Sequence, residues 1–125
     1  MAVVDLEAGL EHLSRGTARH VDTLLLIAEP YFKSLEAAQR SFSLAKDLGI
    51  ARIAMVANKI RTPRDEETVR EFAARHEVRI AGVVPYDQAV VEADERGTAV
   101  IDQRPDAASV AAIRRLADQL LTPAA

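Results

Sequence analysis

Three short apolar runs alternate along the chain with segments in which apolar residues recur every three or four positions. The runs span residues 23–28, 52–57 and 78–84 and are rich in Val, Ile and Leu, which is typical of strands buried on both faces. Strands that alternate with helices over short connections form right-handed βαβ units and a parallel sheet. The pattern therefore predicts a three-layer α/β fold, a mostly parallel sheet flanked by helices, as a single domain over residues 1–125.

Capping residues place four helices between and after these strands. Ser34 is the candidate N-cap of the first, and residues 62–65 (Thr-Pro-Arg-Asp) combine a cap, a first-turn proline and an acid for the second. Asp87 is predicted to cap a third, shorter helix that ends at Gly97. The fourth follows Pro105, with apolar residues at helical spacing.

The start of the chain has a shorter apolar pattern. Residues 2–5 (Ala-Val-Val-Asp) are interpreted as the end of a buried strand, with barely three residues before the acid. A typical strand has about 5–6 residues. We therefore expect only the remainder of a strand here.

Composition narrows the class of protein. The net charge of −3 and the pI near 5.6 argue against a nucleic-acid partner. The chain has no cysteine, and its three scattered histidines are interpreted as structural or surface residues. It has no 18-residue apolar run and no basic flank at its start, so the prediction is a cytoplasmic protein without a membrane partner.

Polar residues follow each predicted strand. In an open parallel sheet the carboxyl ends of the strands reach one edge, where ligands bind. In chain order the polar positions are Asp5 with Glu7, Glu29-Pro30, Asn58-Lys59, and Pro85-Tyr86-Asp87. Since every strand ends in something polar, these residues are alternatively ordinary caps and turn formers. Likewise, Tyr31 and Phe32 are interpreted as packing residues at a helix start.

Two of these positions have a more specific chemistry. An acid after an apolar strand with a glycine four residues later, as in Asp5 and Gly9, suits a loop that approaches a hydrated Mg²⁺ and a γ-phosphate. The Asn58 amide offers donors and an acceptor to a purine edge, and the stem of Lys59 can cover a ring. Alternatively, Asp5 is the N-cap of a helix over residues 6–15.

The same residues carry a resemblance that covers residues 2 to about 120. They resemble the C-terminal half of a MinD/ParA-type deviant-Walker P-loop ATPase, and residues 5–13 are similar to the CooC branch, the nickel-insertion ATPases that mature carbon monoxide dehydrogenase. The matching strings are VDLEAGLEHL at 4–13, VDTLLLIAEP at 21–30, AKDLGI at 45–50, VANK at 56–59 and GVVPYD at 82–87.

The resemblance implies a P-loop NTPase or Rossmann-like fold and a site for ATP or ADP with Mg²⁺ at a dimer interface. It implies that Asp5 is the acid of switch II, linked to Mg²⁺ through water, that Gly9 is its hinge and that Glu7 lies in the same loop. It also implies that Asn58 reads the adenine with Lys59 beside it. The adenine loop that it implies is Pro85-Tyr86-Asp87. The partners that follow are a second copy or the missing N-terminal half, and a metalloenzyme client.

The departures from the family pattern concern the phosphate side. No two of the five glycines frame a G-x-x-x-x-G-K-[ST] motif, and the Cys-x-Cys metal site of the CooC branch is absent. Without that loop, nucleotide binding is expected to be weak or absent, hydrolysis by this chain alone is not expected, and no catalytic residue is assigned. In the family sheet the phosphate-loop strand lies beside the switch II strand, so residues 2–5 lack a neighbour. We expect them to slide beside residues 23–28, to detach, or to pair with another chain.

Two other functions are compatible with the residues. One is a stand-alone α/β interaction or regulatory domain without catalysis, in which the sheet serves as a binding or dimerisation surface. The other is a flavodoxin-like receiver or small-ligand domain. The latter is disfavoured because only Asp5 and Glu7 supply acids near the first strand.

Overall fold

The sheet has the predicted strands and the predicted direction. The computed structural model describes residues 2–6, 10 and 13–121. Within that part the strands form one parallel sheet in the order β1-β2-β3. Their bounds are Leu24–Ala28 for β1, Ile53–Ile60 for β2 and Arg79–Pro85 for β3.

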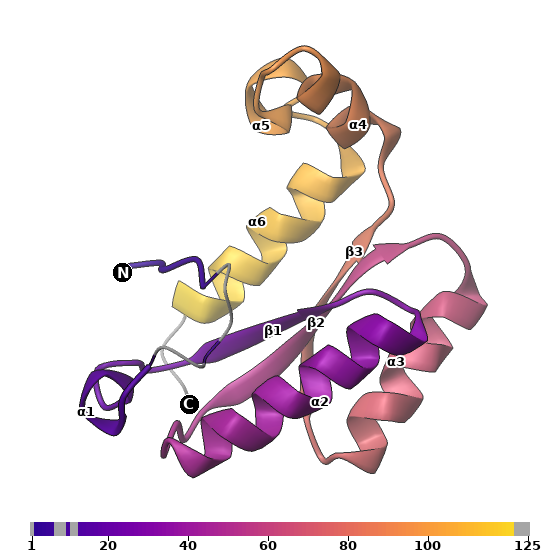
Figure 1. Ribbon diagram of the computed structural model, residues 1–125. Coiled ribbons are helices and arrows are strands. Elements are labelled where there is room, and N and C mark those ends of the chain that lie inside the picture. The colour runs from indigo at the N-terminus through magenta and orange to yellow at the C-terminus, as the bar shows by residue number, and fades with distance from the viewer. Residues whose placement is uncertain (1, 7–9, 11–12, 122–125) are drawn as a thin grey trace.

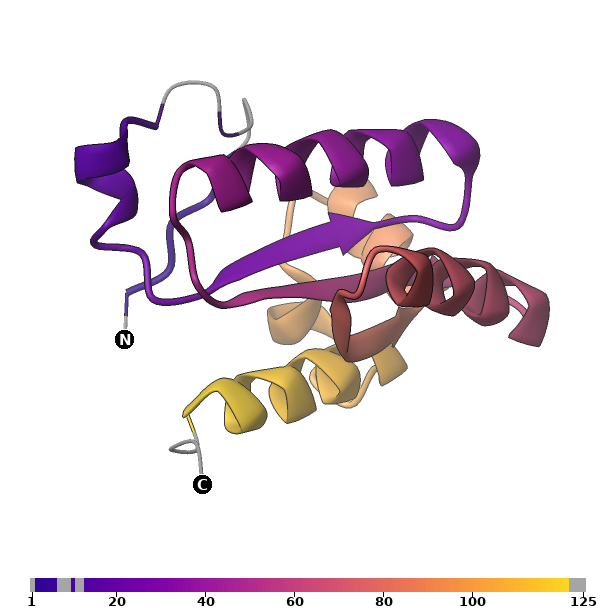
Figure 2. The same cartoon turned by 90° about the horizontal axis from the view of Figure 1, so that it is seen from below.

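Three longer helices make the outer layers of the fold (Figures 1 and 2). The helices α2 (Phe32–Asp47) and α3 (Pro63–Arg75) pack on one face, and α6 (Ala108–Leu121) packs on the other, mainly against β3. Shorter helices are α1 (Arg15–Ala18), α4 (Gln88–Glu95) and α5 (Val100–Gln103). Helices on both faces of a parallel sheet confirm the three-layer α/β prediction.

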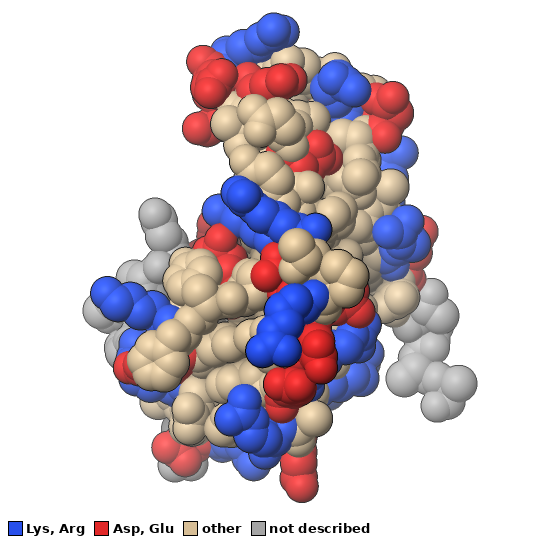
Figure 3. Space-filling view, turned by 90° about the vertical axis from the view of Figure 1, so that its right-hand side faces the viewer, with Lys and Arg blue, Asp and Glu red and all other residues tan. Residues whose placement is uncertain are grey.

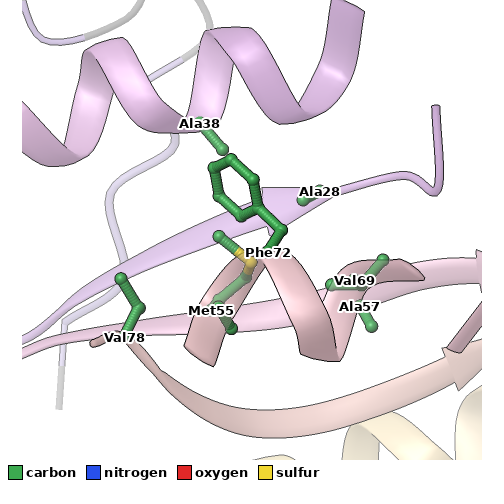
Figure 4. Packing of buried hydrophobic residues seen from close by; sticks show 8 residues of the cluster. Ala28, Ala38, Met55, Ala57, Val69, Phe72 and Val78 are labelled. Carbon is green, nitrogen blue, oxygen red and sulfur yellow. The ribbon is translucent and has the colours of Figure 1, made fainter. Parts of the chain in front are cut away.

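Alternation along β2 explains why both faces of the sheet are covered. Met55 and Ala57 lie in the cluster with α2 and α3, whereas Val56 lies in the cluster with α6. Figure 4 shows Phe72 extending from α3 toward Ala38 of α2, above the buried β2 residues. Since successive side chains of a strand point to opposite faces, an uninterrupted apolar run is required here.

Helix capping agrees with the sequence pattern at two helices and differs at a third. At α3, Thr62 Oγ1 accepts from the Asp65 N–H, and the Asp65 side chain accepts from the Thr62 N–H, which is a capping box. Asp87 caps α4 as predicted. The prediction that Ser34 caps α2 is wrong, because Tyr31 is the N-cap and Ser34 lies in the first turn. There the Ser34 hydroxyl accepts a hydrogen bond from the Glu29 N–H instead.

The first residues do not form the predicted buried strand. Residues 2–6 have no regular structure, and the side chains of Val3 and Val4 are 85% and 76% exposed. In the described part of the chain β1 pairs with β2 alone, so residues 2–5 do not slide beside residues 23–28. A three-residue segment without a neighbouring strand has no partner for its backbone hydrogen bonds, which removes the reason to stay in the sheet.

Candidate functional site

The carboxyl ends of the three strands bring several predicted polar residues together. The register pairs Ala28 with Ala57, so Glu29 and Asn58 follow at the same level of β1 and β2. On the other side, the Tyr86 N–H donates to the Ile60 carbonyl at 2.9 Å, which ties the end of β3 to β2. We call the resulting group the carboxyl-edge cluster. Its members are Glu29, Tyr31, Asn58, Lys59, Arg61 and Tyr86.

Figure 3 views the side of the molecule at which the strands end. Basic and acidic side chains are interspersed in the middle of this face rather than separated into patches of one sign. The ion pair between Lys59 Nζ and Glu29 Oε1, at 3.3 Å, is one such contact. The cluster is therefore locally mixed in charge.

A bulge in β2 determines how Asn58 and Lys59 are presented. Ala57 pairs with Val83 and Ile60 pairs with Pro85, so three steps along β2 match two along β3. Lys59 takes a positive φ of 55°, a left-handed conformation that costs a residue with a Cβ about 1–2 kcal/mol. The sequence placed this dipeptide after the strand. The structure instead continues β2 to Ile60, with the extra residue accommodated by the bulge.

Asn58 is the half-buried residue at the centre of the cluster. Its side-chain amide makes no hydrogen bond with any residue that the structure describes. A primary amide carries two donor hydrogens and an acceptor oxygen, the complement of the edge of a purine base. An amide held at the sheet edge without an internal partner is therefore available to a ligand.

Glu29 is held by its neighbours on both sides of the carboxylate. Tyr31 Oη donates to Glu29 Oε2 at 3.0 Å, while Lys59 contacts the other carboxylate oxygen. The hydrogen bond to the Glu29 carboxylate, followed by its negative charge, raises the pKa of Tyr31. The interpretation of Tyr31 and Phe32 as packing residues is wrong, because the two residues are 52% and 77% exposed. Tyr31 instead contacts the Glu29 carboxylate.

Tyr86 provides the aromatic surface of the cluster. The Arg61 guanidinium lies 4.0 Å from the centroid of the Tyr86 ring, a cation–π contact, and the Tyr86 hydroxyl donates to Gln88 Oε1 at 3.4 Å. Pro85 ends β3 immediately before it. Arg61, just after β2, and Gln88, at the start of α4, thus hold the ring from two sides.

Asp87 is occupied by structural hydrogen bonds. Its Oδ1 accepts from the Ala89 N–H at 3.0 Å, and its Oδ2 accepts from the Ser109 N–H at 3.0 Å and the Ser109 hydroxyl at 2.7 Å. The carboxylate therefore caps α4 and also contacts the start of α6. The hydrogen bonds from Ser109, and then that from Ala89, lower the pKa of Asp87 because they favour the charged form. Through these side-chain hydrogen bonds Asp87 ties the segment that follows β3 to the starts of α4 and α6.

The structure does not bring Asp5 to the carboxyl-edge cluster. The next residue, Leu6, packs against the same buried cluster as Leu24 and Ile53, the residues at which β1 and β2 begin. The segment of residues 2–6 therefore lies toward the end of the sheet at which the strands begin (Figure 1). Leu6 and Ser14 are outside any helix, so the alternative of an Asp5-capped helix over residues 6–15 is wrong. Glu7 and Gly9 lie outside the described residues.

Sequence reasoning missed three members of the cluster. Glu29 was noted only as a polar strand end, Tyr31 was assigned to packing, and Arg61 was given no role in the site. Their common signal is position, because each lies within four residues of the end of an apolar run on adjacent predicted strands. The contact of Glu29 with Lys59 also depends on the bulge in β2, which no local sequence pattern predicts.

The described residues fit one side of a nucleotide better than the other. The Asn58 amide and the Tyr86 ring suit a base, but the described residues contain no group of three or more His, Asp or Glu side chains that could hold a metal ion. The sequence also lacks a phosphate-loop motif. Among the described helices, none has the length and apolar character needed to cross a bilayer.

The parallel sheet with helices on both faces and a polar carboxyl edge defines the class of three-layer α/β proteins. Comparison with protein families then identifies the family within this class: residues 2–100 match the CobQ/CobB/MinD/ParA nucleotide binding domain. The chain belongs to this family of nucleotide-binding domains.

Individual relatives agree with that assignment. Carbon monoxide dehydrogenase accessory protein CooC of Rhodospirillum rubrum is 38% identical over 103 residues, which are 82% of this chain and 38% of the relative. The MinD cell division protein of Aquifex aeolicus matches in structure with a TM-score of 0.74 at 19% identity, over 94% of this chain and 51% of its own. The septum site-determining protein MinD of Pyrococcus horikoshii, solved with Mg-ADP, matches with a TM-score of 0.65 at 18% identity. The match covers 81% of this chain and 42% of the MinD chain. The chain thus spans between a third and about half of these proteins.

Proposed function

We propose that this chain forms the base-binding side of an adenine-nucleotide site, with ATP or ADP as the ligand. The observation that carries the proposal is the half-buried Asn58 amide, which has no hydrogen-bond partner in the described part of the chain. Family membership supports a nucleotide as the ligand, and the solved MinD with Mg-ADP supports adenine. In this proposal the amide reads the edge of the base.

Neighbouring residues would complete the base side. The stem of Lys59 covers part of the ring, and the Pro85-Tyr86 segment closes over it. Asp87 orients that segment, because its carboxylate is already bonded to the starts of α4 and α6. The Arg61 guanidinium stacks on the Tyr86 ring and holds it at the sheet edge.

The phosphate side requires residues that this sequence does not carry. We propose that a phosphate-loop segment, from the same protein or from another chain, joins this domain to make a complete MinD/CooC-type ATPase. Asp5, Glu7 and Gly9 would then serve the Mg²⁺ and γ-phosphate side of the joined site. We also propose a role in metallocentre assembly with a metalloenzyme as client, which similarity to a carbon monoxide dehydrogenase accessory protein supports. A dimer as the working form and the cytoplasm as its location belong to the same proposal.

Calorimetric titration with MgATP tests the proposal. We expect saturable binding with a dissociation constant below about 1 mM, and at least tenfold weaker binding by Asn58→Ala. The matched control is Gln39→Ala, which removes an exposed amide on α2, away from the sheet edge. Binding that is equally strong in the Asn58 variant would reject the assignment of the base.

A specific observation favours a second candidate function, that of an interaction domain. Within the described residues, one edge of β1 is unpaired, and the side chain of Ile27 in that strand is 57% exposed. Light scattering across a concentration series tests this candidate. Self-association that Ile27→Ser abolishes and MgATP leaves unchanged would favour it over the nucleotide site.

A further inference from the structure

Glu29 is fixed at the sheet edge by both its backbone and its side chain. The Glu29 N–H donates to the Ser34 hydroxyl at 2.8 Å, inside the first turn of α2. The carboxylate accepts from Tyr31 at one oxygen and contacts Lys59 Nζ at the other. The side chain is 28% exposed, about half of the 59% of Lys59. An acid fixed in this way presents its charge at a defined place.

The lysine that Glu29 contacts is at the least favourable backbone position of β2. Lys59 is one of two described non-glycine residues with a positive φ, and it lies within the register shift between Ala57 and Ile60. Asn58 directly precedes it and shares its peptide bond. Any relaxation of Lys59 toward an ordinary strand conformation therefore turns the Asn58 side chain, because successive strand residues point to opposite faces.

We propose that Glu29 is a positioning residue: by holding Lys59 across β1 and β2, it keeps the bulge in the conformation that presents the Asn58 amide at the carboxyl edge. This inference rests on the proposed function for the identity of the ligand that Asn58 meets. Its structural part, the dependence of the bulge on Glu29, does not need a ligand.

The contact differs from an ordinary surface ion pair, which contributes little to stability. Glu36 and Arg40 form such a pair at 2.7 Å along the exposed face of α2, and both belong to one helix. The Glu29–Lys59 pair instead joins two strands at a strained backbone position. The Glu36 pair is therefore the matched control for loss of a glutamate charge.

A double-mutant cycle tests the inference on the full chain. The variants are Glu29→Gln, Lys59→Gly, the two combined, and Glu36→Gln. Glycine adopts a positive φ without a steric cost, so Lys59→Gly keeps the bulge without help from Glu29. Two quantities are measured in each variant: amide hydrogen exchange of residues 57–60 without nucleotide, and the dissociation constant of MgADP.

We expect Glu29→Gln to accelerate exchange at residues 57–60 at least tenfold and to weaken MgADP binding at least fivefold. In the Lys59→Gly background the same substitution should change each quantity less than twofold, and Glu36→Gln should change neither. The ionisation midpoint of Tyr31, followed by tyrosinate absorbance, should fall in Glu29→Gln, which reports loss of the charge next to the hydroxyl.

Equal effects of Glu29→Gln in both backgrounds, or no effect on exchange in either, would overturn the inference. If the unmodified chain does not bind MgADP, the proposed function fails, while the exchange cycle still decides whether Glu29 holds the bulge. If Glu29→Gln does not fold, Lys59→Met removes the same ion pair from the other strand. Unchanged exchange at Asn58 in that variant would equally overturn the inference.

Discussion

Asp87 connects the loop after β3 to two helices, so its replacement should destabilise more than an ordinary surface substitution. Asp87→Ala removes the acceptors of the Ala89 N–H and of both Ser109 donors. Ser109 is 2% exposed, so its hydroxyl loses its partner in a place that water barely reaches. The perturbation thus combines two lost helix contacts with a poorly solvated hydroxyl.

The magnitude follows from these contacts. Loss of an N-cap costs about 1 kcal/mol, and Asp87 serves the starts of both α4 and α6. An unsatisfied hydroxyl in a buried place adds about 1 kcal/mol. We therefore expect Asp87→Ala to lower the free energy of unfolding by about 2–3 kcal/mol. Asp87→Asn, which retains one acceptor oxygen, should lose about half as much.

Urea denaturation followed by far-ultraviolet circular dichroism measures this loss. With a slope of about 2 kcal/mol per molar urea, the midpoint should fall by about 1 M or more. The control is Asp94→Ala, which removes an exposed carboxylate near the end of α4 and should change stability by less than about 0.5 kcal/mol. The reasoning is refuted if Asp87→Ala costs less than 0.5 kcal/mol or no more than Asp94→Ala.

Further predictions concern pH, the core and a helix cap. Because the pKa of Asp87 is lowered in the folded chain, its charge stabilises the fold at pH values above the ordinary aspartate pKa of about 3.9. That stabilisation is lost as the pH falls through the lower pKa of the folded state. The difference in unfolding free energy between the unmodified chain and Asp87→Asn, measured by chemical denaturation, should therefore shrink below about pH 4. Phe72→Ala should cost about 3–5 kcal/mol in urea denaturation because the ring is 7% exposed, whereas Phe32→Ala, 77% exposed, should cost under about 0.5 kcal/mol; equal losses would contradict the core assignment. Thr62→Ala removes the acceptor of the α3 capping box and should lower the thermal midpoint, equivalent to about 1 kcal/mol; an unchanged midpoint would contradict it.

Local patterns predicted the helices and strands well because each signal acts within a few residues. The Thr62-Pro63 start of α3 and the Asp87 cap of α4 are side-chain contacts over two or three positions. The buried strands were visible as apolar runs because both sheet faces are covered. Ser34 failed as a cap because the chain entering α2 starts the helix earlier, at Phe32, and redirects the serine to Glu29.

Contacts between strands were harder to predict. The bulge at Lys59 depends on how β2 pairs with β3, and the contact with Glu29 depends on how it pairs with β1. Neither register is encoded within one segment. Residues 2–5 failed for a related reason, because an apolar run becomes a strand only where another strand is available to pair with it.

A nuclear magnetic resonance titration of the isotope-labelled chain with MgADP tests the central claim most directly, because it reports both binding and place. The account predicts saturable shifts of the Asn58 side-chain amide and of the backbone amides of Lys59 and Tyr86, with little change at Leu24 and Ile53, where β1 and β2 begin. Saturable shifts confined to the beginnings of those strands, or no shifts at millimolar MgADP, would contradict a nucleotide site at the carboxyl edge.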